Sequence, residues 1–128
     1  MIEDTKSYLN QELAKTVALA ASDRKASDIL ILEVTEICYL ADYFVIVTGF
    51  STTQLKAIAQ TIEEKVYQEY SQAPRHSEGK KNSNWILQDF GDVITHIFLP
   101  EEREFYNLEA FWNNAKKLEL SSLGIIEP

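Results

Sequence analysis

A chain of 128 residues is one domain by length and long enough to bury a core. Its apolar fraction of 45% and charged fraction of 25% are those of an ordinary globular protein, and no apolar run is long enough to span a membrane. Twenty acidic against twelve basic residues give a net charge of −8, which disfavours nucleic-acid binding through phosphates. The same charge favours a basic partner, although it could also serve solubility alone.

The N-terminus and the cysteine content indicate the compartment. Glu3 and Asp4 make the first residues acidic where a signal or transit peptide would be basic. The single cysteine, Cys38, excludes an internal disulfide. We therefore expect the protein to work in the cytosol.

The first half of the chain predicts a helix and two buried strands. Apolar residues recur at helical spacing over residues 4–23, namely at Leu9, Leu13, Val17, Ala20 and Ala21. Asp28–Val34 and Asp42–Thr48 are short runs rich in branched apolar residues, which is typical of buried strands.

A second helix is predicted over Ser51–Tyr70. Gly49 breaks the preceding strand, and Ser51 with Gln54 three positions later has the spacing of a capping box. One face of this helix is apolar and consists of Leu55, Ile58, Ala59, Ile62 and Val66. Ser71–Ser83 is expected to be a loop with a short strand near His76.

A β-hairpin is predicted around Gly91-Asp92, because both residues accept the left-handed backbone of a two-residue turn. The register then pairs Phe90 with Val93, Asp89 with Ile94, Leu87 with His96, and Trp85 with Phe98. One face carries Trp85, Leu87, Asp89, Ile94, His96 and Phe98, and the other carries Ile86, Gln88, Phe90, Val93, Thr95 and Ile97. Both faces are apolar enough to need cover, so another molecule could cover one of them.

The C-terminal region is expected to continue as a helix over about Glu101–Leu118, with Tyr106 and Trp112 in the core. Residues 121–128 have no strong pattern and are expected to form a tail after a domain of residues 1–120. Together the elements predict a single compact α/β domain with a mixed sheet and packed helices, in which the Ser51–Tyr70 helix could link a parallel pair. The strand order is not predictable from one sequence.

Two catalytic interpretations are weaker than structural ones. Gly49-x-Ser51 before a helix resembles the phosphate-contacting turn of nucleotidyltransferases, but Glu63 and Glu64, the acids that follow, point in different directions on a helix. We therefore expect a nucleotidyltransferase-like topology without its catalytic residues, and no cofactor. Cys38 with a histidine base lacks any identifiable orienting acid or oxyanion site and is expected to be a small buried hydrophobe. His76 and His96 lack the spacing of metal ligands.

Asp89 and His96 are diagonal neighbours in the predicted hairpin, within reach of a charge-assisted hydrogen bond. One interpretation is a semi-buried pair that fixes strand register. The other is a binding surface with Trp85 as an anchor and Asp89 as an acidic contact, because interfaces favour a large aromatic residue ringed by polar groups.

The hairpin reads W-I-L-x-D-F-G-D-x-x-x-H-I-F and is followed by R-x-F-Y-x-L-E-x-F-W. This string resembles the ribosomal silencing factor family, also called Iojap-like. The resemblance covers about Leu13–Leu118 and includes residues 40–46 (LADYFVI), Gly49-Phe50-Ser51, and Pro74 ahead of Glu78-Gly79. The family usually has Asn where this chain has Phe50.

The resemblance implies a translational repressor, not an enzyme, which binds the large ribosomal subunit through its protein fourteen and blocks subunit joining. It implies little direct contact with nucleic acid, none with a membrane, and a free protein that could form a homodimer. The residues expected to bind the partner are Asp42, Tyr43, Glu78, Trp85, Leu87, Asp89, His96 and Phe98.

Overall fold

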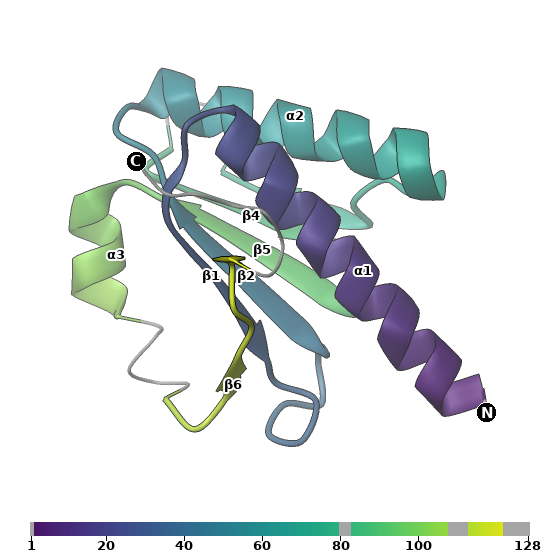
Figure 1. Ribbon diagram of the computed structural model, residues 1–128. Coiled ribbons are helices and arrows are strands. Elements are labelled where there is room, and N and C mark those ends of the chain that lie inside the picture. Colours follow the sequence, from purple (N-terminus) through teal and green to yellow (C-terminus); the bar gives the residue numbers. More distant parts are fainter. Residues whose placement is uncertain (1, 80–82, 108–112, 122–128) are drawn as a thin grey trace.

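The computed structural model describes residues 2–79, 83–107 and 113–121 and shows one sheet with two long helices on a single face (Figure 1). The six strands run in the order β3-β4-β5-β2-β1-β6. β2 and β5 pair in parallel and all other neighbours pair antiparallel, which confirms the predicted mixed sheet. The strands are β1 Ser27–Glu33, β2 Tyr43–Thr48, β3 His76–Glu78, β4 Trp85–Asp89, β5 Val93–Phe98 and β6 Lys116–Lys117.

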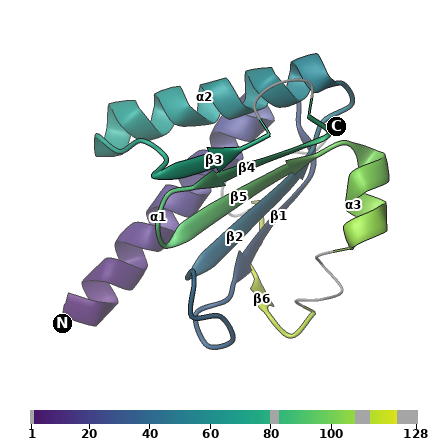
Figure 2. The same cartoon turned by 180° about the vertical axis from the view of Figure 1, so that it is seen from behind.

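The helices α1 (Ile2–Asp23) and α2 (Thr52–Tyr70) pack on the same face of the sheet, as Figure 2 shows from the opposite side. The short α3 (Pro100–Tyr106) follows β5 at one end of the sheet. The main core lies between the long helices and the sheet and includes Leu13, Val17, Ala21, Leu55, Ile58, Ile62, Val66, Ile86, Val93 and Ile97. Leu9, which the periodicity placed on the apolar face of α1, is instead 53% exposed, because the first turns of α1 reach past the sheet (Figure 1).

The predicted start of α2 is confirmed. The hydroxyl of Ser51 accepts the backbone N–H of Gln54 at 3.0 Å, which satisfies a donor that the helix leaves free. The side-chain oxygen of Gln54 accepts the N–H of Phe50 at 2.7 Å, one residue further back than in a standard capping box. The amide nitrogen of Gln54 also donates to the carbonyls of Arg24 and Lys25 at 3.1 and 3.2 Å. The cap therefore fastens the start of α2 to the loop after α1.

The hairpin has the predicted turn and register. Phe90 and Val93 close the Gly91-Asp92 turn with a backbone hydrogen bond of 2.9 Å, and Gly91 has a φ of +97°. The four predicted cross-strand pairs are present, down to Trp85 opposite Phe98. The turn also starts the parallel pair, because the carbonyl of Asp92 accepts the N–H groups of Asp42 and Tyr43 at 2.7 and 3.0 Å.

The expected long C-terminal helix is wrong in its extent. α3 ends at Asn107, whose left-handed backbone lets its N–H bond the carbonyl of Arg103 at 2.9 Å. Asn tolerates this conformation better than most residues and ends helices for that reason. Further on, Lys116–Lys117 forms β6 against β1, where the periodicity predicted helix. The expected core positions of Tyr106 and Trp112 lie outside the side chains that the structure describes.

Two glycines with positive φ give a matched test of the β3–β4 edge. A Cβ on Gly79 (φ +83°) would lie 2.1 Å from the carbonyl oxygen of Trp85, whereas a Cβ on Gly91 (φ +97°) would meet nothing within 4 Å. Gly91→Ala should therefore lower the free energy of unfolding by about 1 kcal/mol, through backbone conformation alone. Gly79→Ala should lower it by roughly 3 kcal/mol, because the backbone beside Trp85 must move. Urea denaturation of both variants would measure this, and equal losses would contradict a tight edge.

Candidate partner-binding site

The two long helices leave the opposite side of the sheet uncovered by any described helix, and we call this side the open face (Figure 2). Strand alternation and the observed register place one set of side chains on it. These residues are Leu30, Leu32, Phe44, Ile46, His76, Glu78, Trp85, Leu87, Asp89, Ile94, His96 and Phe98. In its β1–β2 half Leu32, Phe44 and Ile46 are buried, whereas Leu30, Trp85, Leu87 and Ile94 remain partly exposed. The open face is therefore an apolar surface with most of its accessible part over β4 and β5.

Four aromatic rings form the centre of the open face. Trp85 packs on Phe98 with ring centroids 4.7 Å apart, and His96 lies 5.8 Å from Trp85 and 5.9 Å from Phe98. Phe44 meets His96 edge-on at 5.4 Å. The indole N–H of Trp85 donates to Nδ1 of His96 at 3.2 Å. The cluster thus combines apolar packing with one internal hydrogen bond that fixes the orientation of two rings.

His96 is neutral in this environment. It is only 7% exposed, and burial lowers its pKa from 6.5 to about 4. The ring neighbours Phe44, Trp85 and Phe98 offer no charge that would stabilise an imidazolium. Since Nδ1 accepts the indole proton, the imidazole proton resides on Nε2.

The predicted hydrogen bond between Asp89 and His96 is absent, so this prediction is wrong. The carboxylate of Asp89 instead accepts the N–H of Gly91 at 2.8 Å and pairs with Arg75 at 3.1 Å. Arg75 precedes β3, and its position beside Asp89 depends on the β3–β4 pairing. Asp89 therefore caps the hairpin turn and neutralises Arg75 at the border of the open face.

Glu78 lies on the edge strand β3, opposite Leu87. Its side chain is 67% exposed, and its carboxylate lies 3.5 Å from Nε2 of His76. Glu78 and Asp89 give the border of the open face acidic groups beside the apolar centre. The structure thus brings Glu78, Leu87 and Asp89 onto the same face as the half-buried Trp85.

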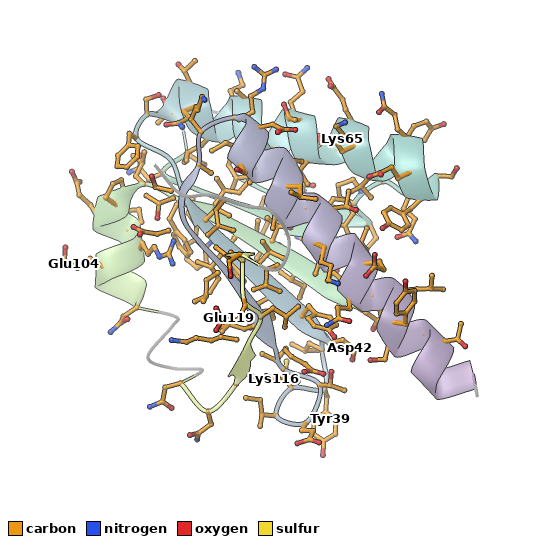
Figure 3. The ribbon with its side chains drawn as sticks, viewed as in Figure 1. Tyr39, Asp42, Lys65, Glu104, Lys116 and Glu119 are labelled. Carbon is orange, nitrogen blue, oxygen red and sulfur yellow. The ribbon has the colours of Figure 1, made fainter. Side chains whose placement is uncertain are left out.

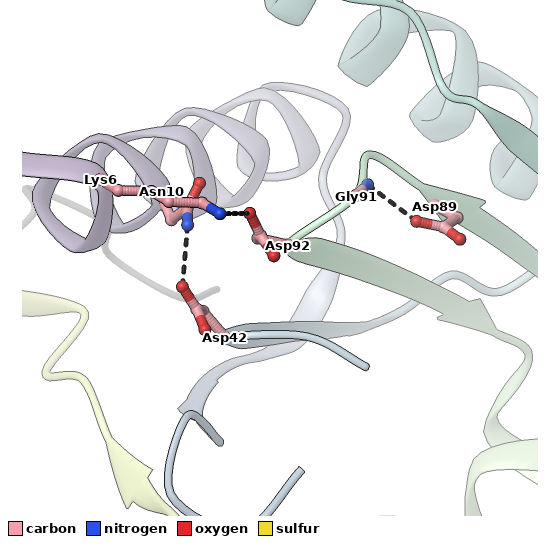
Figure 4. Close-up of polar contacts among 6 residues, drawn as sticks. All are labelled: Lys6, Asn10, Asp42, Asp89, Gly91 and Asp92. Atoms are coloured by element: carbon pink, nitrogen blue, oxygen red, sulfur yellow. Dashed lines mark hydrogen bonds and ion pairs between the residues drawn. The ribbon is translucent and has the colours of Figure 1, made fainter. Parts of the chain in front are cut away.

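Asp42 and Tyr43, two further predicted contacts, lie beside α1 rather than on the open face. Asp42 accepts the side-chain amide of Asn10 at 2.8 Å, and Lys6 pairs with Asp92 nearby at 3.6 Å (Figure 4). Tyr43 is 2% exposed in the helix-side core. Burial raises the pKa of its hydroxyl above 10, and the carboxylates of Glu33 and Asp42 add to the effect. These residues hold α1 on the sheet.

The turn that resembles a nucleotidyltransferase has a packing role. A Cβ on Gly49 would lie 2.7 Å from the Leu55 side chain, so glycine lets α2 start close to the sheet. Glu63 and Glu64 both lie within α2, as predicted. Among residues 2–79, 83–107 and 113–121, no group of three or more His, Cys, Asp or Glu could hold a metal ion.

The β1–β2 loop presents apolar side chains that sequence reasoning missed. Tyr39 and Leu40 are exposed, with Ile37 partly so, and Figure 3 shows Tyr39 at the tip of the loop. Cys38, between them, packs against the apolar cluster under the open face. Three apolar residues after the Thr35-Glu36 break were the available signal. Phe50, the departure from the usual family residue, is 63% exposed beside Arg103, which donates to the hydroxyl of Thr48 at 2.9 Å.

A small α/β domain with one sheet face left apolar, aromatic and bordered by acids has the composition that is typical of a protein-binding surface. In the described part of the chain no helix is long and apolar enough to cross a membrane. Residues 8–127 match the family model described as "Ribosomal silencing factor during starvation". The chain belongs to this ribosomal silencing factor family, whose members are regulatory factors that act on the ribosome and repress translation.

Proteins from bacteria and plants have sequences similar to this chain. The chain is 39% identical over 114 residues to ribosomal silencing factor RsfS of Halalkalibacterium halodurans, covering 89% of this chain and 97% of that protein. It is 43% identical over 107 residues to the chloroplastic protein Iojap of Zea mays, covering 84% of this chain but only 46% of the maize protein. The chain therefore spans about half the length of that plant relative.

Solved structures share the fold. A crystal structure of a Chromobacterium violaceum protein matches with a TM-score of 0.76 and 35% identity, over 80% of this chain and 85% of that one. A Bacillus halodurans protein matches with a TM-score of 0.72 and 37% identity, over 85% and 98% of the two chains. These likenesses confirm the family resemblance and the α/β fold.

The lowered pKa of His96 predicts a specific loss of stability in acid. Below pH 6.5 the unfolded chain takes up a proton at this residue, whereas the folded chain does so only near pH 4. Stability is therefore full above pH 6.5 and falls between these values, by about 3 kcal/mol for this group. Denaturation between pH 7.5 and 4.5 should show this fall, and it should be smaller in His96→Phe. An equal pH dependence in both proteins would contradict the buried, neutral His96.

Proposed function

We propose that the chain binds the large ribosomal subunit through ribosomal protein fourteen and so prevents the small subunit from joining. The observation that carries the proposal is the partly exposed Trp85 at the centre of an apolar face, with Glu78 and Asp89 at its border. Large aromatic residues in apolar surroundings are the side chains that dominate binding energy at protein interfaces. Membership of a family of ribosomal silencing factors supports a partner on the ribosome.

The charge of the chain supports a basic protein as the direct contact. With a net charge of −8, the chain is repelled by ribosomal RNA and attracted to basic ribosomal proteins. The acidic groups at the border of the open face would steer a basic surface toward the aromatic centre. Such a contact requires no catalysis, because a bound molecule of this size excludes the other subunit by occupying its place.

The contact set of this proposal is narrower than the predicted one. Trp85, Leu87 and Ile94 provide accessible apolar area, Glu78 provides an exposed negative charge, and Asp89 contributes an ion pair with Arg75. Phe98 packs against Trp85, His96 orients its indole through the hydrogen bond at Nδ1, and Asp42 and Tyr43 hold α1. We place the activity in the cytoplasm, and in the free protein two copies could pair through the open face.

Co-sedimentation with isolated subunits tests the proposal, and Glu78→Lys tests its surface. The wild-type protein should pellet with large and not small subunits and should lower the yield of joined ribosomes. Glu78→Lys replaces an attraction by a repulsion, and its affinity for large subunits should fall about tenfold. The free energy of unfolding should change by less than about 0.5 kcal/mol, because the Glu78 side chain is largely exposed.

Glu64→Lys is the matched control, since it makes the same change of charge at an exposed position of α2 behind the sheet. It should bind as the wild type does. Equal losses in the two variants would assign the effect to net charge and remove the open face from the contact. Sedimentation with both subunits, or with neither, would refute the proposed function.

The nucleotide-handling alternative has its own test. Gly49 lets α2 start close to the sheet, and the adjacent Glu63 and Glu64 of α2 are not arranged as a metal-binding pair. Calorimetric titration with ATP and GTP in the presence of Mg²⁺ should therefore give no stoichiometric heat. A saturable, magnesium-dependent signal would favour an enzyme instead.

A further inference from the structure

The Nε2–H group of His96 is a polar donor at the centre of the open face that the fold does not use. The other donor there, the indole N–H of Trp85, is already engaged, because it donates to Nδ1 of His96. His96 itself has no acceptor for its Nε2–H among the described residues, whose contacts to this ring are the indole bond and three ring packings.

The ring of His96 lies on the open face and not on the helix side of the sheet. The buried side-chain polar atoms left without a partner in the described part of the chain are Gln88 Oε1 and Thr95 Oγ1, on the helix side of the sheet. His96 Nε2 is not among them, and strand alternation places the ring on the open face, where the residue as a whole is 7% exposed. It is a donor N–H surrounded by the rings of Phe44, Trp85 and Phe98.

We propose that His96 is a specificity-determining residue, which donates its Nε2–H to a carbonyl oxygen of the protein partner at the centre of the open face. This inference rests on the proposed function and specifies the chemistry of its contact. The Trp85 indole fixes the ring in the orientation that directs Nε2–H outward. A partner that places an apolar group or a lysine there leaves the donor unpaired or faces it with another donor, which disfavours binding.

The inference divides the partner surface into two chemical zones. Basic side chains of the partner meet Glu78 at the border, where its largely exposed carboxylate is an acceptor. A backbone or side-chain carbonyl meets His96 at the centre, where the ring offers a donor and no acceptor. Burying this donor inside an apolar contact makes its hydrogen bond matter more than one at an exposed border.

The free protein tests the donor directly. A long-range ¹H–¹⁵N correlation spectrum at neutral pH should show His96 as the Nε2–H tautomer, with Nδ1 accepting a proton from the Trp85 indole. A Trp85→Phe variant assigns the indole signal and should release Nδ1. The Nδ1–H tautomer in the wild type would overturn the inference without any ribosome present.

Two amide variants of His96 then distinguish the role of Nδ1 from the role of Nε2 in binding. His96→Asn keeps a side-chain oxygen near the position of Nδ1 and lacks a donor at Nε2, whereas His96→Gln keeps an amide N–H near Nε2. Affinity for large subunits should fall about tenfold in His96→Asn but stay within about threefold of wild type in His96→Gln. The indole proton should remain hydrogen-bonded in His96→Asn, and binding is measured below the lowest melting temperature of the set.

The outcomes distinguish the two proposals. Wild-type affinity in His96→Asn, or an equal loss in both variants, would overturn the role of Nε2–H while leaving the ribosomal function intact. Failure of the wild-type protein to bind large subunits would refute the proposed function, and the inference about the partner would fall with it.

Discussion

The parallel pairing of β2 with β5 is the constraint on which the rest of the arrangement depends. It aligns Phe44 with Ile94, Ile46 with His96, and Thr48 with Phe98, so the side chains of both strands alternate in step. With α1 and α2 on one side, every second residue of four strands must contribute to the opposite side. The chain therefore builds two apolar clusters around one sheet. Its helices cover only the first.

The open face combines two kinds of polarity that act at different distances. The carboxylate of Glu78 at its border is exposed, so it attracts a basic surface over a range of about 10 Å at moderate salt. The imidazole at its centre is buried and neutral, so it acts only on contact. Charge would govern the rate at which a partner associates, and the central hydrogen bond would govern how slowly the correct partner dissociates.

Local patterns predicted the hairpin well, because Gly91-Asp92 and strict alternation leave one register in which Trp85 opposes Phe98. They did not predict that Asp89 pairs with Arg75, because that contact depends on the pairing of β3 with β4. Local patterns also did not predict that Tyr43 faces the helices. Its strand is apolar on both faces, so the sequence shows no alternation that would tell one face from the other. The end of α3 at Asn107 depended on one left-handed residue within a helical pattern.

The two outer strands of the sheet are very short, β3 with three residues and β6 with two. Long, flat outer strands expose rows of unpaired backbone groups that recruit strands of other molecules and start aggregation. Here the β3 edge carries a charged residue, Glu78, and β6 consists of two lysines. The apolar sheet face can therefore be kept for binding without promoting fibrils. Fibrils extend from strand edges, and the two edges of this sheet are short and charged.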